Sequence, residues 1–246
     1  MKKVMFGLFL VIAFCLAGCN SNPVITKATG MTYDVMLVME RNYWEGSVGE
    51  AIQADLRAPI QYLPQEEASL DISYTAPDGF NSFMKYVRNI VMVEINPSAY
   101  TKVTLKYEKD RWASGQIVAI LKAPDTTAVV NYLAEKPRLL SDFFTNVEIN
   151  RAITLVEKNY SSTVYNVLKE KHDIALKVPE KFDFYKDTTD FFWATNNATT
   201  GRMDVVVYTF PYEDENTFTA EYLLAKRDSV MKENLPGAFP GSYMAT

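Results

Sequence analysis

The sequence has few of the side chains on which most enzyme chemistry depends. Its 246 residues include one histidine, His172, which excludes metal sites built on two histidines and leaves one imidazole for acid and base work near neutral pH. Acidic residues outnumber basic ones, 30 against 25, and the formal charge of -5 argues against nucleic acid as a partner. We therefore expect neither a cofactor nor a metal, and the sequence identifies no reaction.

The sequence also lacks an apolar run long enough to span a bilayer. The longest apolar stretch covers residues 4–17 and is interrupted only by Gly7, whereas a spanning helix needs about 20 residues. Lys2 and Lys3 precede this stretch and small residues follow it. A basic start, a short apolar segment and small residues are typical of an export leader, so residues 1–18 are predicted to be a cleaved signal peptide.

The end of this leader, Leu16-Ala17-Gly18-Cys19, resembles the lipobox of bacterial lipoproteins. The resemblance implies that diacylglycerol is attached to the Cys19 thiol and that the chain is cut before it. Cys15 lies inside the leader and would be discarded, so the mature chain would have no disulfide. The alternative is an ordinary secretory leader that is cut nearby.

The residues after Cys19 predict the location of the protein. Loss of Lys2 and Lys3 with the leader leaves 23 basic and 30 acidic residues, a charge of -7, so acyl chains rather than electrostatic attraction would hold the protein to anionic lipid. Residues 19–30 are polar and read as a tether. No acidic run follows Cys19, and residue 20 is not the aspartate of lipoproteins kept in the inner membrane. We expect a lipid-anchored outer-membrane protein that faces the periplasm and has an envelope protein as partner.

The rest of the chain, residues 31–246, is predicted to be α+β, with mostly antiparallel sheets and packed helices. Strands are predicted at residues 33–39, 70–75, 89–95, 102–109, 116–121, 174–178, 191–194 and 203–210. Helices are predicted at residues 42–56, 80–87, 125–171 with a break at Pro137, and 216–233. Asn42 with Glu45 resembles a capping box, and Asp125 is a candidate N-cap. Two subdomains, 31–125 and 172–246, remain an option. Because no strand or helix closes the last residues, either the tail is a loop or the chain is a truncated one.

Three segments carry a resemblance to a known family. They are RNIVMVEI at 88–95, WASGQIVAI at 112–120 and MDVVVYTFPY at 203–212. Together with the lipobox they resemble an uncharacterised family of Bacteroidetes lipoproteins classed as a domain of unknown function. The resemblance implies an envelope lipoprotein and gives no catalytic residues to carry over.

Candidate contact residues are the three tryptophans, Trp44, Trp112 and Trp193, although such side chains more often anchor a core. We predict a non-enzymatic binding or assembly role. One alternative is a lipid-anchored periplasmic hydrolase that uses a carboxylate pair such as Asp187 and Asp190. The other is a carbohydrate-binding module, which would require the tryptophans to be exposed and aligned.

Overall fold

A computed structural model describes residues 26–63 and 65–245. The predicted leader and lipobox, including Leu16, Ala17, Gly18 and Cys19, lie outside the described residues. Over the described ranges, no helix combines the length and the apolarity needed to cross a bilayer. The chain divides into two compact units, the first ending at Ile149 and the second beginning at Asn150.

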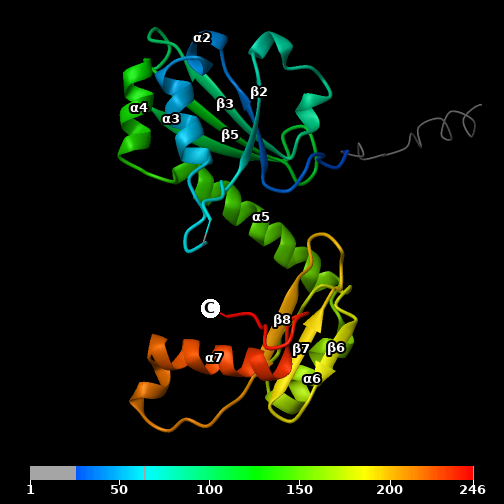
Figure 1. The fold of residues 1–246 in the computed structure, drawn as a ribbon. Coiled ribbons are helices and arrows are strands. Elements are labelled where there is room, and N and C mark those ends of the chain that lie inside the picture. The colour runs from blue at the N-terminus through cyan, green and yellow to red at the C-terminus, as the bar shows by residue number, and fades with distance from the viewer. Residues whose placement is uncertain (1–25, 64, 246) are drawn as a thin grey trace, which may run out of the picture. The chain divides into compact units, whose positions relative to one another are not determined.

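Unit 1 is built on a mixed sheet of five strands in the order β2-β1-β3-β5-β4 (Figure 1). The strands are β1 (Asp34–Val38), β2 (Asp71–Thr75), β3 (Asn89–Ile95), β4 (Thr104–Lys109) and β5 (Ile117–Ala123). β1 pairs in parallel with β2 and β3, β3 pairs in parallel with β5, and β4 runs antiparallel to β5.

The prediction of mostly antiparallel sheets is right for β4 with β5, but the other three pairings of this sheet are parallel and β3 does not pair with β4. The sequence of β5, IVAILKA, is almost continuously apolar, which suits a central strand that is buried on both faces. The sequence of β4, TLKYEK, is largely polar and exposed, which suits a sheet edge. β5 therefore lies between β3 and β4.

Helices cover one face of this sheet. They are α2 (Arg41–Trp44), α3 (Ser47–Leu56), α4 (Thr126–Ala134) and α5 (Leu139–Lys158), the last of which crosses the boundary between the units. Residues of α3, α4 and the start of α5 pack against Val35 and Leu37 of β1 in the main core. On the opposite face, Val38, Ile90 and Val118 form a smaller cluster.

Local interruptions account for the helix predictions that failed. The predicted helix at 42–56 is split near Gly46, and the Asn42 capping box is wrong because Asn42 lies inside α2 and no side chain caps it. A Cβ at Gly49 would lie 2.0 Å from the Trp44 carbonyl oxygen, so only glycine lets α3 pass this close to α2. Within the helix predicted at 80–87 the structure has only a 3-10 turn, Met84–Tyr86, and a second 3-10 turn, Pro77–Gly79, precedes the predicted range. Asp125 does cap α4, as predicted.

Unit 2 has an antiparallel sheet of three strands, β6 (Phe184–Asp187), β7 (Phe191–Thr195) and β8 (Asp204–Tyr208). Helix α6 (Ser162–His172) packs on it through Val164 and Leu168, and α7 (Ala220–Asn234) follows β8 and a 3-10 turn, Glu215–Phe218. The strand predicted at 174–178 is wrong: these residues are irregular, and Val178 is buried as a loop residue. Both units together confirm the α+β class.

Candidate functional site

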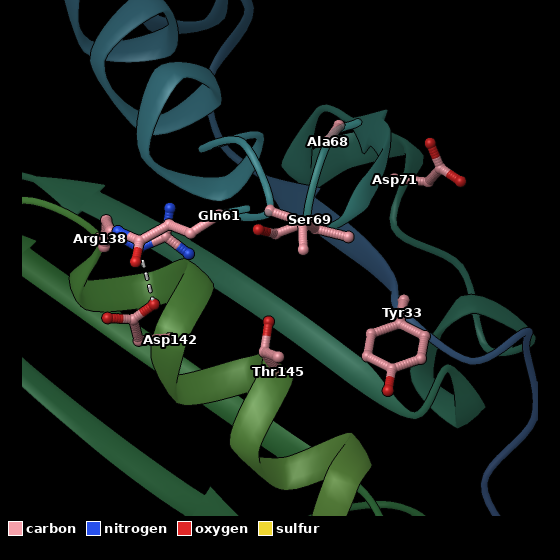
Figure 2. A pocket seen from close by; sticks show the side chains of 9 residues that line it. Tyr33, Gln61, Ala68, Ser69, Asp71, Arg138, Asp142 and Thr145 are labelled. Atoms are coloured by element: carbon pink, nitrogen blue, oxygen red, sulfur yellow. Dashed lines mark hydrogen bonds and ion pairs between the residues drawn. The ribbon is translucent and has the colours of Figure 1, made fainter. Parts of the chain in front are cut away.

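An open groove of about 590 Å³ lies in unit 1, at the edge of the sheet where the parallel strands begin (Figure 2). Tyr33 immediately precedes β1, and Asp71 is the first residue of β2. Ligands of open α/β sheets usually bind at the opposite edge, beyond the carboxyl ends of the strands, so fold analogy does not account for this groove. Its walls are formed by Tyr33, Ile60, Gln61, Ala68, Ser69, Asp71, Arg138, Asp142 and Thr145.

One wall of the groove is a hairpin loop, which we define as residues 58–69. Pro59 and Ala68 form a β-bridge, and the Ile60 N–H donates to the Glu67 carbonyl at 2.9 Å. The Arg138 guanidinium also holds the loop, because its Nη1 donates to the Pro59 carbonyl at 2.8 Å. The base of the hairpin loop is therefore fixed.

The opposite wall is the first part of α5, which Asp55 of α3 positions. The Asp55 carboxylate accepts hydrogen bonds from the backbone N–H groups of Leu139, Leu140 and Ser141 at 3.0, 2.9 and 3.0 Å. Burial raises the pKa of Asp55 above its usual value and outweighs these bonds, which lower it. Asp55 thus acts as an N-cap supplied from a distant helix.

Backbone strain is concentrated at the groove and its hairpin loop. Three of the six described non-glycine residues with positive φ lie here: Tyr33 at 64°, Tyr62 at 67° and Arg138 at 64°. The other three are aspartate or asparagine, which tolerate this conformation, whereas for tyrosine and arginine the left-handed conformation costs about 1–2 kcal/mol each. Strain of this kind persists at sites that need a fixed geometry.

Apolar side chains of the groove and of its hairpin loop are exposed. Ile60 and Tyr33 line the groove and are 43% and 40% exposed, and Tyr62 and Leu63 of the hairpin loop are 100% and 42% exposed. Inside the groove, the Thr145 hydroxyl oxygen is buried and has no hydrogen-bond partner among the described residues, an arrangement that native proteins seldom leave unexplained. These side chains form a surface suited to contact with another molecule.

The carboxylates of the groove do not form a catalytic pair. Asp142 accepts from Arg138 Nε at 2.9 Å, and Figure 2 shows the Asp71 side chain pointing away from Asp142. Among the described residues no group of three or more His, Cys, Asp or Glu could hold a metal ion. The arrangement supports binding through apolar and hydrogen-bonding contacts and offers no evident reacting group.

The three tryptophans lie outside the groove, and each is half-buried. Trp44 stacks on Tyr74 with ring centroids 4.4 Å apart, as part of the main core of unit 1. Trp112 packs edge to face on Phe80, against the smaller core. Trp44 and Trp112 therefore anchor structure in unit 1.

Trp193 lines a second cavity, of about 890 Å³, in unit 2. Its indole Nε1 donates to Asp204 at 2.9 Å, and Arg202 binds the same carboxylate. Burial favours a higher pKa for Asp204, but the hydrogen bonds from Arg202 and Trp193 hold it below its usual value. The polar groups are thus largely satisfied by one another.

The remaining titratable residues that the sequence singles out do not form a reactive cluster. Asp187 forms an ion pair with Lys171, and Asp190 is exposed. His172 is the last residue of α6, the helix-end position that its neighbours in the sequence suggest, and its Nε2 is buried without a partner among the described residues. None of these side chains lines the groove.

Sequence reasoning missed the groove itself. The one available signal was the segment Ile60-Gln61-Tyr62-Leu63, which is apolar yet stands between Pro59 and Pro64, where neither helix nor strand can extend. The remaining wall residues are far apart in the chain, from Tyr33 to Thr145, and only the fold brings them together.

Fold and site thus define a two-unit α+β protein with an open groove in its first unit. Residues 28–157 match the domain of unknown function DUF8532, and the chain belongs to this family. Residues 161–246 match a second domain of unknown function, DUF4837. The boundary between the two matches lies within about ten residues of the boundary between the compact units. No curated protein and no solved structure is detectably similar to the chain.

Proposed function

We propose that this protein is an envelope lipoprotein of the Bacteroidetes type, anchored to the outer membrane through acylated Cys19, which binds or organises a partner protein and catalyses no reaction. The basic start, the short apolar segment and the lipobox-like tetrapeptide ending at Cys19 support the anchor. The acidic mature chain is consistent with attachment through acyl chains.

The observation that carries the binding role is Tyr62. This side chain is 100% exposed and its φ is 67°. The backbone conformation therefore destabilises the fold, and the ring makes no packing contact that would offset this cost. Its neighbours in the hairpin loop add exposed apolar surface: Ile60, which lines the open groove, and Leu63. Exposed apolar surface next to a concavity is typical of protein-interaction sites.

The two alternatives receive less support from the same residues. A hydrolase that cleaves glycosidic bonds through a carboxylate pair needs two converging carboxyl groups about 5–9.5 Å apart, whereas Asp71 points away from Asp142, and Asp187 is paired with Lys171. A carbohydrate-binding module needs exposed, aligned aromatic rings, whereas Trp44 and Trp112 are packed against cores.

Photocrosslinking in cells tests the binding role. Benzoylphenylalanine replaces Leu63 of the hairpin loop in the full chain, and for the control it replaces Phe83, which is 82% exposed and lies outside both the hairpin loop and the groove lining. We expect one reproducible protein adduct from position 63 and not from position 83. Equal labelling at both positions, or no adduct at position 63, would contradict the proposal.

The anchor is tested separately by Cys19→Ala. The substitution removes the thiol that the lipid would occupy, so we expect the protein to leave the membrane fraction. Cys15→Ala is the matched control, since this cysteine would be removed with the leader. Membrane association that survives Cys19→Ala would show that another feature holds the protein.

A further inference from the structure

The geometry points to a specific kind of occupant: an extended segment of a partner protein whose apolar side chains are flanked by lysine or arginine. This inference rests on the proposed binding function and adds the chemistry of the ligand. The occupant would lie between the hairpin loop and the first turns of α5.

The apolar part of the occupant follows from the exposed residues around the groove. Ile60, Tyr62 and Leu63 follow one another along the hairpin loop with only Gln61 between the first two, and Tyr33 faces the groove from the start of β1. Large side chains left in water gain free energy when apolar atoms cover them. A partner that covers them must therefore present aliphatic or aromatic side chains.

The size of the groove favours an extended chain over a helix. One turn of an α-helix with its side chains, about 10–12 Å wide and 5.4 Å tall, fills roughly 400–600 Å³. The whole groove measures about 590 Å³, so it would hold about one turn of a helix. An extended segment can instead place a few alternate side chains in the groove and continue past it.

The cationic flanks follow from the charges of the groove and of the hairpin loop. The groove is lined by Asp71, Asp142 and Arg138, and the hairpin loop adds the exposed Glu66 and Glu67, so four carboxylates and one guanidinium leave a local formal charge of -3. The Arg138 guanidinium already binds Asp142 and the Pro59 carbonyl. The Asp142 side chain is 57% exposed, and only one of its oxygens accepts from Arg138. Positive charge on the partner therefore complements the negative charge of the groove and the hairpin loop.

The same charges argue against a membrane as the occupant. Tyr62 and Leu63 could enter a lipid interface, but Glu66 and Glu67 are exposed on the same hairpin loop and would be repelled by anionic headgroups. A protein segment with cationic flanks satisfies both the apolar residues and the carboxylates.

Paired synthetic peptides test the inference. One set has an apolar core of valine and phenylalanine flanked by lysine, and the other has the same cores flanked by glutamate. Fluorescence anisotropy measures their binding to the purified full chain in nonionic detergent. We expect the lysine-flanked set to bind at least about tenfold more tightly, with a preference that falls as salt rises.

Variants assign any binding to the groove. Tyr62→Gly should weaken binding of the lysine-flanked peptides about tenfold or more. Glu66→Gln with Glu67→Gln should remove most of the preference for lysine flanks. The control, Glu45→Gln with Glu50→Gln, makes the same charge change at exposed residues outside the hairpin loop and the groove lining and should leave the preference intact.

Four results would overturn the inference. The first is equal affinity for both peptide sets. The second is no binding of either set while the adduct at position 63 persists, which would leave the proposed function standing and refute the cationic segment. The third is Tyr62-dependent binding of the Cys19→Ala chain to vesicles containing phosphatidylglycerol, which would assign the surface to the membrane. The fourth is the absence of any adduct at position 63 in the otherwise unchanged chain, which would refute the proposed function and this inference together.

Discussion

Replacing Asp55 by alanine should destabilise unit 1, because this carboxylate is the cap of α5. The change leaves three N–H groups, which now donate at 2.9–3.0 Å, without an acceptor, and two of them belong to the buried residues Leu140 and Ser141. An unsatisfied buried donor costs about 1–3 kcal/mol. Burial of the carboxylate destabilises the wild type, and removing the carboxylate relieves this cost and offsets part of the loss. We therefore expect a net loss of about 3 kcal/mol in the free energy of unfolding, against about 1 kcal/mol for an ordinary exposed cap.

Urea unfolding followed by circular dichroism measures this loss, and hydrogen exchange at residues 139–141 reports it locally. Asp142→Ala is the control, since its side chain is 57% exposed and its ion pair with Arg138 is a surface one; it should cost less than about 1 kcal/mol. A loss from Asp55→Ala no larger than the control's, or unchanged exchange at 139–141, would refute the capping role.

The pH dependence gives an independent check through Asp55→Asn, which keeps the shape and removes the titration. The pKa of Asp55 is raised in the folded chain from an ordinary 3.8, so the folded state binds the proton more tightly than the unfolded state. The stability of the wild type relative to Asp55→Asn should therefore fall as pH rises from 3.8 through the raised pKa, and then level off. A relative stability that rises over this range would contradict the sign.

Three further results are expected. Gly49→Ala should cost several kcal/mol in urea unfolding, because its Cβ would lie 2.0 Å from the Trp44 carbonyl oxygen; a loss as small as that of Glu50→Ala would count against this packing. Glu148→Ala should cost about 3 kcal/mol, since it removes the buried carboxylate that pairs with Arg88 at 2.8 Å; a loss under about 1 kcal/mol would disagree. Burial raises the pKa of Tyr107 to about 12, so ultraviolet titration should lose its late-ionising component in Tyr107→Phe.

The apolar runs predicted much of the fold because burial selects them directly. Strands β1, β3, β5 and β8 lie where continuous apolar, β-branched segments occur, and Asp125 caps α4 as its position suggested. The order of the strands was not predictable from the sequence. The pairing of β3 with β5 depends on which strand can lie at the exposed edge, and this is decided by the whole sheet and not by one segment.

The site was beyond sequence reasoning for a different reason. Positive φ at Tyr62 and Arg138 contradicts the local preference of those residues, so no propensity rule could place them. Asp55 caps a helix that begins 84 residues later in the chain, and no spacing rule reaches so far. Tryptophan is the rarest aromatic residue of the sequence, but the most exposed large apolar side chain among the described residues is Tyr62.

The most direct test of the binding role combines one substitution with two readouts. In Tyr62→Gly the backbone strain is relieved and no buried contact is lost, because the ring is 100% exposed. We therefore predict that the free energy of unfolding stays within about 1 kcal/mol of the wild type or rises, while the protein adduct from benzoylphenylalanine at position 63 disappears. An adduct that persists in Tyr62→Gly at wild-type yield would contradict the account.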